Sequence, residues 1–482
     1  MRFSLYNRKY LNQYKGGILN LYAEIILNSE AIEIDRPFTY KVPLDMEQKV
    51  KVGQMVRVPF GVRSKPVEGF ILDLKEEEMK VSFKMKNILS VENEEPVITE
   101  DDLKLINFLR EEYLSKYIDA IRLLIPVGIL KGAKSKSRSV IVYIDDNLES
   151  IKNSDGYLEV INFIKRNTGK YTKSELTKEH GVSLYKLNKL IEHGLIKSEK
   201  EIVFRYNTRE YNKDVEKKLT AEQSMAIEAI EDSEENLILL KGVTGSGKTE
   251  VYMRLVEKVL TEGKSAIVLV PEIALTPQMI ERFKGRFGSN VALFHSKLSD
   301  GERFDEWYRV KEGKASLIIG ARSAIFLPAR KLGLIIIDEE HENTYKSDQN
   351  PKYQTKEVAE FISKLKGCKV ILGSATPTIE SYYRAISGEM KLVELNHRID
   401  NRPMPEMKLV DMREELRSGN KSIFSRRLYA SMQQKLEKGE QIILFLNRRG
   451  FSTFVSCRSC GYVFDCENCD ISMTYHKNGF LV

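Results

Sequence analysis

The sequence has no apolar run that approaches the ~20 residues of a membrane-spanning helix. Its first residues, MRFSLYNRKYLNQYKGG, are basic but lack the continuous apolar core of a secretory signal, so we expect a cytoplasmic protein. Neither sign of charge dominates. The net charge of +7 over 482 residues permits a nucleic-acid partner without requiring one. A chain of this length, with 42% hydrophobic and 30% charged residues, has room for roughly three or four globular domains.

Cysteine is also scarce, with five residues in the whole chain. Cys368 stands alone in an apolar stretch, which favours a core thiol. The other four form two C-x-x-C pairs, Cys457 with Cys460 and Cys466 with Cys469. In a cytosolic protein this arrangement favours a bound metal over disulfides.

The stretch GVTGSGKT follows the apolar run Leu237–Leu240 and precedes a helical pattern at Glu250–Leu260. A strand, a Gly-rich loop and a helix in this order predict a phosphate-binding loop, whereas an accidental match would be only a turn. Its backbone N–H groups can wrap a polyphosphate at a helix N-terminus. Lys248 can reach the β- and γ-phosphates, and the Thr249 hydroxyl can bind Mg²⁺. The expected nucleotide-binding residues are Gly242, Thr244, Gly245, Ser246, Gly247, Lys248 and Thr249.

The rest of the chain divides around this loop. We expect an extension (1–20), a small β-rich module ending in helices (21–130), a linker and winged helix (131–207), a nucleotide-binding α/β unit (208–395) and the start of a second α/β unit (396–482). The basic linker KGAKSKSRS could instead contact DNA. Three short helices followed by a β-wing favour the winged helix, with a plain helical packing module as the alternative.

Continuous apolar runs alternating with helices predict a parallel sheet that is buried on both faces. The expected strands are 237–240, 266–270, 291–295, 316–320, 334–338 and 370–374, with one more at 442–446 in the second unit. Ligands bind at the carboxyl ends of such strands. The polar motifs PEIALTPQ, GARSAIF, DEEH and GSATP stand at these ends.

Asp338 and Glu339 follow one of these strands directly. Asp338 can hold Mg²⁺ through its waters, and Glu339 can accept a proton from the attacking water. The alternative for Asp338 is a helix cap. His341 could report the γ-phosphate or cap the same helix. Gln223 precedes the loop at a distance that suits recognition of adenine, although alone it would be an ordinary helix residue.

Gly320 and Arg322, in GARSAIF, are candidates for contacts with single-stranded DNA. Arg322 could equally make an internal salt bridge. Ser374 and Thr376, in GSATP, can bridge the nucleotide site and a nucleic-acid site.

In this order the motifs resemble those of superfamily 2 helicases, and in detail those of the PriA family of bacterial replication-restart helicases (primosomal protein N′). The resemblance rests on GVTGSGKTEVY, LVPEIALTPQ, GARSAIF, IIIDEEHENTYKSDQNPKY, GSATPTIES, ILFLNRRGF and the paired C-x-x-C. It implies RecA-like helicase lobes with a zinc-binding insertion, preceded by a DNA-binding module that holds the 3′ end of the nascent strand and by a winged helix. The implied activity is 3′-to-5′ ATP-dependent DNA unwinding at stalled forks, with ATP, Mg²⁺ and two Zn²⁺. The implied partners are forked and single-stranded DNA, primosome proteins and single-strand-binding protein.

The resemblance also assigns DNA contacts. The 3′-end pocket would contain Phe38, Thr39 and Lys86, although many relatives have an acid in place of Thr39. The aromatic-rich loop that couples DNA to hydrolysis would be YKSDQNPKY, with Tyr345, Lys346 and Tyr353 as its contacts. Lys356 stands where relatives usually have arginine.

Two features depart from the family. In relatives each C-x-x-C pair belongs to a different zinc ion that later cysteines complete, and here only His476 follows as a possible ligand, so we expect both zinc sites to be half complete. Relatives also continue for a few hundred residues, which include the arginines of the second lobe. We therefore expect a C-terminally truncated chain that binds ATP more surely than it hydrolyses it.

Two functions remain open at this point: an ATP-driven helicase, and a non-catalytic fragment that binds fork DNA and ATP. A P-loop ATPase that acts on protein is a third, weaker hypothesis. It would lack GARSAIF and the aromatic-rich loop, which this chain has.

Overall fold

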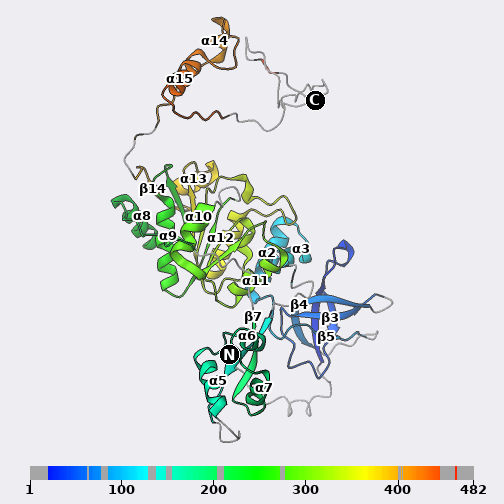
Figure 1. The fold of residues 1–482 in the computed structure, drawn as a ribbon. Coiled ribbons are helices and arrows are strands. Elements are labelled where there is room, and N and C mark those ends of the chain that lie inside the picture. Colours follow the sequence, from blue (N-terminus) through cyan, green and yellow to red (C-terminus); the bar gives the residue numbers. More distant parts are fainter. Residues whose placement is uncertain are drawn as a thin grey trace. The chain divides into compact units, whose positions relative to one another are not determined.

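The computed structural model describes residues 20–61, 65–77, 85–126, 128, 137–147, 155–202, 211–271, 277–399, 403, 405–445 and 462–463. The chain divides into two compact units, residues 1–401 and 402–482. Within the first unit we distinguish the N-terminal module (20–126), the helical module (137–202) and the parallel-sheet domain (211–399) (Figure 1). In the described part of the chain, every helix is too short or too polar to span a bilayer.

The N-terminal module is an antiparallel sheet followed by two helices, which agrees with the β-rich module that the sequence predicts. The strand order is β2-β1-β4-β3-β5. The elements are β1 (Asn20–Leu27), the 3₁₀ turn η2 (Ile32–Ile34), β2 (Phe38–Lys41), β3 (Met55–Phe60), β4 (Lys65–Glu77), β5 (Ser90–Val91), α2 (Glu100–Tyr113) and α3 (Tyr117–Leu124). Helix α2 begins at a capping box, in which Thr99 accepts a hydrogen bond from the Asp102 amide and Asp102 accepts one from the Thr99 amide.

The helical module has the three expected helices, α5 (Asp155–Arg166), α6 (Lys173–Lys178) and α7 (Leu184–Glu192). Strand β7 (Ile196–Ile202) follows them and pairs antiparallel with β6 (Ser137–Tyr143), which precedes them. The expected linker therefore gives way to a strand at Ser137. The winged-helix interpretation stays a prediction.

A seven-stranded parallel sheet forms the centre of the third module, in the order β10-β11-β9-β12-β13-β8-β14. Its strands are β8 (Leu237–Gly242), β9 (Ser265–Leu269), β10 (Val291–Phe294), β11 (Leu317–Gly320), β12 (Leu332–Asp338), β13 (Lys369–Ser374) and β14 (Lys391–Leu395). The six strands expected in this region are confirmed. The edge strand β14 was not expected, because Lys391 and Glu394 interrupt its sequence KLVEL, which therefore lacks a continuous apolar run.

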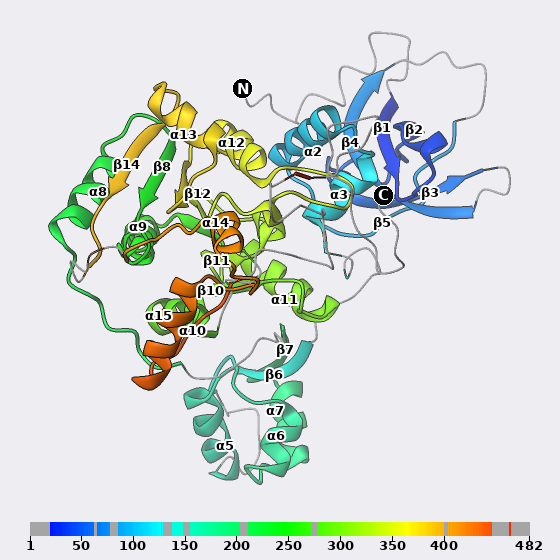
Figure 2. The same cartoon turned by 90° about the horizontal axis from the view of Figure 1, so that it is seen from above.

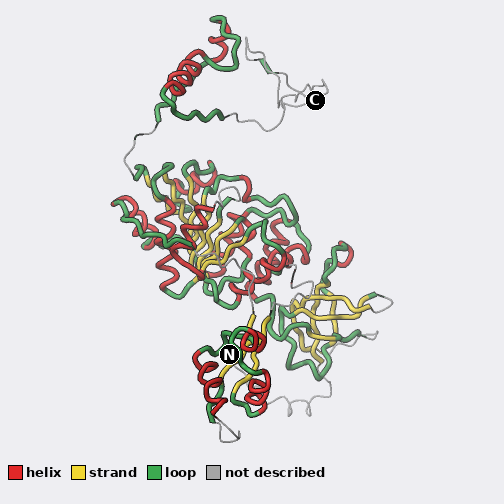
Figure 3. Tube along the Cα trace, viewed as in Figure 1, coloured by secondary structure: helices red, strands yellow, loops and turns green. Residues whose placement is uncertain are grey.

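Helices cover both faces of this sheet (Figures 2 and 3). Alternate residues of β12 belong to different cores: Ile336 packs in one cluster, and Ile335 and Ile337 pack in the other. The first cluster includes residues of α8 (Ala221–Glu231), α9 (Lys248–Thr261) and α10 (Pro277–Phe287). The second includes residues of α11 (Asp300–Lys311), α12 (Thr355–Lys366) and α13 (Ile379–Ile386). Burial on both faces leaves the carboxyl edge of the strands as the place for polar chemistry.

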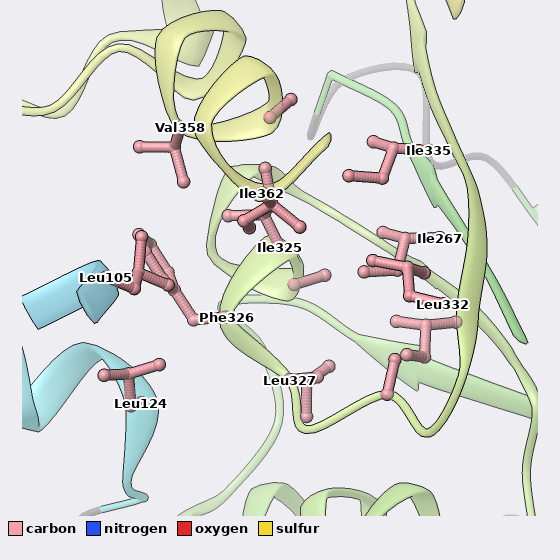
Figure 4. Close-up of a cluster of buried hydrophobic side chains, with 14 of the residues drawn as sticks. Leu105, Leu124, Ile267, Ile325, Phe326, Leu327, Leu332, Ile335, Val358 and Ile362 are labelled. Carbon is pink, nitrogen blue, oxygen red and sulfur yellow. The ribbon is translucent and has the colours of Figure 1, made fainter. Parts of the chain in front are cut away.

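The second core continues into the N-terminal module. Leu105 of α2 and Leu124 of α3 point toward Phe326 of the parallel-sheet domain (Figure 4). Phe108 of α2 stacks on Phe361 of α12 with ring centroids 4.2 Å apart. The indole N–H of Trp307, which is 4% exposed, donates to the Leu124 carbonyl over 2.9 Å. These contacts join the two modules in one hydrophobic cluster.

The second unit contains two described helices, α14 (Met412–Arg417) and α15 (Arg426–Glu437). The prediction of a buried strand at 442–446 is wrong for its described residues: 442–445 have no regular secondary structure, and Ile443 is 93% exposed. No sheet strand is described from residue 403 onward. An apolar run needs paired neighbours to become a strand, and the described residues supply none here.

Replacing Trp307 with phenylalanine should loosen α3 while keeping most of the buried ring. The Leu124 carbonyl would lose its N–H donor, at a cost of about 1–3 kcal/mol. We expect amide hydrogen exchange in α3 to become about 5- to 100-fold faster, as measured by mass spectrometry. The control is Tyr185→Phe, at an exposed position on α7. Unchanged exchange in α3 would show that the indole bond does not hold the modules together.

Candidate functional site

The loop between β8 and α9 has the backbone that a phosphate-binding loop needs. Gly245 and Gly247 have φ values of +86° and +82°, which favour glycine. A Cβ on Gly242 would lie 2.8 Å from the Ser246 hydroxyl oxygen. Helix α9 begins at Lys248, so the loop leads directly into its unpaired N–H groups. Its expected glycines are therefore required by conformation and close approach.

Two polar side chains of this loop suit an anionic ligand. The Lys248 ammonium donates to the Gly242 carbonyl over 2.8 Å, which holds it folded over the loop. The Ser246 hydroxyl is buried, and no hydrogen-bond partner is described for it. Thr244 is exposed and Thr249 is partly buried. A buried hydroxyl without a partner is costly, and a phosphate oxygen would satisfy it.

Gln223 lies in the first turn of α8 and is 2% exposed. Its amide oxygen accepts from the Thr220 amide over 2.9 Å, which completes a capping box. Its amide nitrogen donates to the Ser246 carbonyl over 2.8 Å. The side chain thus ties α8 to the phosphate-binding loop. Recognition of adenine by Gln223 stays a prediction.

Asp338 ends β12, between β9 and β13. Its carboxylate accepts a hydrogen bond from the buried Tyr252 hydroxyl over 2.9 Å. Burial raises the pKa of Asp338 above its ordinary value, and the negative charge of Glu339 raises it further. The Tyr252 hydrogen bond and the positive charge of Lys248 lower this pKa. Tyr252 belongs to α9, so its hydrogen bond places Asp338 beside the helix into which the loop leads.

The residues after Asp338 form turns. The 3₁₀ helix η5 (Asn343–Tyr345) follows with Glu342 as its N-cap residue, and the next α-helix is α12. The alternative in which Asp338 or His341 caps a following helix is therefore wrong. The His341 ring nitrogen Nδ1 lies 2.8 Å from the Ser374 hydroxyl at the end of β13 and 3.6 Å from the Glu339 carboxylate. This contact links the DEEH and GSATP motifs across two strand ends.

Sequence reasoning missed the role of Glu340, which is 1% exposed. Its carboxylate accepts from the Thr378 amide and the Lys356 ammonium, both over 2.7 Å, and from the Ser381 hydroxyl over 3.0 Å. Lys356 therefore balances the buried charge of Glu340. No local sequence pattern pairs Glu340 with Lys356, which lies 16 positions later in the chain.

The expected DNA-contact residues lie near the acids but differ in exposure. Tyr345 is 2% exposed, and its hydroxyl donates to the carbonyls of Asp338, over 2.6 Å, and Leu269, over 3.1 Å. Tyr353 is also buried and packs its ring edge-on against Phe326. Neither ring offers a free face to a base, because both are used to hold the loop.

The other expected DNA-contact residues of this region also differ in exposure, since Gly320 is buried and Arg322 is partly buried. Lys346 is exposed. Arg322 begins the 3₁₀ helix η4 (Arg322–Phe326) and donates to the carbonyls of Thr344 and Lys346, an internal contact that is not the salt bridge considered above. Gly320 is required by packing, since a Cβ would lie 2.1 Å from the Phe294 carbonyl oxygen.

A cavity of about 610 Å³ adjoins this loop. Its lining includes the three arginines Arg122, Arg303 and Arg322 and the aromatic residues Phe294, Trp307, Tyr345 and Tyr353. The positive charge of these arginines suits the phosphates of a nucleic-acid strand.

In the N-terminal module the three expected 3′-end residues lie around β2. Phe38 is partly buried and packs edge-on against Phe60. The Thr39 hydroxyl donates to Glu24 over 2.9 Å, so an acid lies beside the position where many relatives carry one. Lys86 is exposed, and its backbone carbonyl accepts from the Lys41 amide at the end of β2.

The four paired cysteines, Cys457, Cys460, Cys466 and Cys469, lie outside the described residues. Within the described ranges, no cluster of three or more His, Cys, Asp or Glu side chains could hold a metal ion. Mg²⁺ at a nucleotide site does not need such a cluster, because one carboxylate, a hydroxyl, waters and phosphates suffice. Asp338 and Thr249 have the required chemistry.

Comparison with known proteins agrees with this geometry. Residues 24–126 match the 3′DNA-binding domain family of PriA, and residues 220–385 match the DEAD/DEAH box helicase family. The chain is 40% identical to the replication restart protein PriA of Bacillus subtilis, over 95% of this chain and 66% of that protein. It is 36% identical to PriA of Chlamydia trachomatis, over 95% of this chain and 62% of that protein. It thus spans just under two thirds of the length of these relatives, and it belongs to the PriA family of replication restart proteins.

Proposed function

We propose that this chain is an ATP-driven DNA helicase of replication restart that binds forked and single-stranded DNA and moves 3′ to 5′. The observation that carries the proposal is the pair of hydrogen bonds from the Tyr345 hydroxyl to the carbonyls of Asp338 and Leu269. Asp338 lies next to the phosphate-binding loop, and Tyr345 is the first residue of the aromatic-rich loop that is expected to contact DNA. The two residues are therefore in direct contact. A movement of either residue should therefore displace the other.

Each group has a defined task in this proposal. Lys248 and the loop amides bind the polyphosphate, while Asp338 and Thr249 hold Mg²⁺, which neutralises phosphate charge when bound. Glu339 accepts the proton of the attacking water. His341, bonded to Ser374, relays changes at the nucleotide to the end of β13. Recruitment of primosome proteins and single-strand-binding protein, and Zn²⁺ binding by the paired cysteines, complete the proposal.

Catalytic turnover is tested with Lys248→Ala. Removing the ammonium deletes a charge-assisted contact to the phosphates, so DNA-stimulated phosphate release should fall at least about 100-fold. Lys258→Ala is the matched control on the same helix, because its exposed ammonium pairs with Glu231 away from the loop. If the unmodified chain releases no more phosphate than Lys248→Ala while fork binding persists, the chain is a non-catalytic fork-binding protein.

Fork binding should weaken as salt rises, because lysine and arginine contacts to phosphates release counterions. Lys86→Ala should reduce the magnitude of the slope of log K against log salt by about 0.7–0.9, the share of one phosphate contact. Fluorescence anisotropy with a fork that carries a 3′ end measures this slope. Lys264→Ala is the control, since this lysine pairs with Glu262 and lies just before β9, at the amino edge of the sheet. Salt-independent binding would contradict the proposal.

Mg²⁺-dependent affinity for the nucleotide should fall at acidic pH, and this fall, the acid limb of the pH profile, should move to higher pH in Tyr252→Phe. Asp338 must be deprotonated to hold Mg²⁺, so affinity falls as the pH drops through its raised pKa. The Tyr252 hydrogen bond lowers this pKa, and the variant removes it while keeping the ring. Titration of a fluorescent ADP at several pH values, with and without Mg²⁺, measures the limb. Tyr383→Phe, at an exposed position, is the control. An acid limb at the same pH in the variant and the unmodified chain would show that Asp338 does not hold Mg²⁺.

A further inference from the structure

The segment Asn396–Ile399, which follows β14, lies against the phosphate-binding loop. The Ile399 amide donates to the Gly245 carbonyl over 3.1 Å. Upstream, the Glu222 carboxylate of α8 accepts from the amides of Asn396, over 2.7 Å, and His397, over 3.2 Å. Burial opposes ionisation of this carboxyl, but the two amide hydrogen bonds lower the pKa of Glu222 overall, so it anchors the segment as an anion. The segment is therefore fixed to both the loop and the helix that contacts it.

Arg398 runs along the loop. Its Cγ and Cδ atoms lie 3.7 and 3.8 Å from the position that a Cβ on Gly245 would occupy. Its Nε is buried, and no partner is described for it. Arginine stays charged and presents N–H donors in a planar fork that matches phosphate oxygens. A buried N–H donor without a partner, beside a loop built to bind phosphates, lacks an acceptor that a nucleotide would supply.

The neighbouring side chain makes this placement specific. Ile399 lies 2.8 Å from where a Cβ on Gly247 would be, on the same side as the Gln223 amide. It closes that side of the loop with apolar surface. The aliphatic part of Arg398 lies against Gly245, in the middle of the loop that is proposed to bind the polyphosphate.

We propose that Arg398 is a further nucleotide-binding residue, which donates from its guanidinium to the polyphosphate held by the loop. The inference rests on the proposed ATP site and adds a ligand from outside the loop. It makes the segment that leaves the parallel-sheet domain part of the nucleotide site. Nucleotide binding then fixes this segment as well as the loop.

The test is Arg398→Ala in the full chain, with affinities for ATP and inorganic tripolyphosphate measured by displacement of a fluorescent ATP analogue. Loss of a charge-assisted contact should weaken both ligands by about 10- to 100-fold. Arg398→Lys, which keeps the charge but not the fork, should restore part of the loss for both ligands. Arg413→Ala is the control, because this exposed arginine pairs with Asp411 in the second unit.

Equal affinities of Arg398→Ala and the unmodified chain would overturn the inference and leave the proposed function standing, provided that Lys248→Ala loses binding. A loss for ATP without a loss for tripolyphosphate would overturn the phosphate contact. If the unmodified chain shows no binding that depends on Lys248, both the proposed function and the inference fail. Unchanged thermal melting of Arg398→Ala would separate a lost contact from a folding defect.

Discussion

The hydroxyl of Tyr345 donates to two backbone carbonyls at the carboxyl ends of neighbouring strands, those of Asp338 on β12 and Leu269 on β9. The ring is buried, and burial together with nearby carboxylates raises the pKa of Tyr345 far above its ordinary value, so the hydroxyl stays a neutral donor. Without this donor, the carbonyls of Asp338 and Leu269 would lose the hydrogen-bond partner that they share at the strand ends. The loop that Tyr345 begins is held further by Arg322, which donates to the carbonyls on either side of the tyrosine. The same backbone carbonyls therefore support both the proposed nucleotide site and the aromatic-rich loop that is expected to contact DNA.

The sequence predicts the strands of the parallel sheet well, because strands buried on both faces are continuous apolar runs of a length that few helices have. The same reasoning fails for two other segments, strand β14 and the apolar run at 442–446. Strand β14 lies at the sheet edge, where the exposed Lys391 and Glu394 break the apolar run. The run at 442–446 has the right composition but no paired neighbour among the described residues. An apolar run alone therefore guarantees neither burial nor a strand, because both depend on pairing and packing with distant segments.

The residues of the candidate site also divide into those that the sequence predicts and those that it does not. The loop residues Gly242 to Thr249 are predictable because their function depends on local backbone geometry within eight consecutive positions. The bond from Tyr252 to Asp338 spans 86 positions, and the capping glutamine Gln223 reaches 23 positions to the loop. No local pattern encodes such contacts. Tyr345 and Tyr353, which the resemblance assigns to DNA contacts, are both buried, and their contact with DNA stays a prediction.

Glu339, the proposed base, has a φ of +47°, which is uncommon for a residue with a side chain and costs of order 1–3 kcal/mol. Such a conformation persists only where its surroundings impose it. The Glu340 amide donates to the Gly373 carbonyl over 3.0 Å, and the Glu342 amide donates back to the Glu339 carbonyl over 2.9 Å. The Glu340 carboxylate is fixed in turn by Lys356, Thr378 and Ser381. Hydrogen bonds to a charged group contribute roughly 1.5–3 kcal/mol each, enough to offset the strain. The buried acid Glu340 thus has no direct part in the proposed chemistry, but it holds the preceding acid, Glu339, in its strained turn.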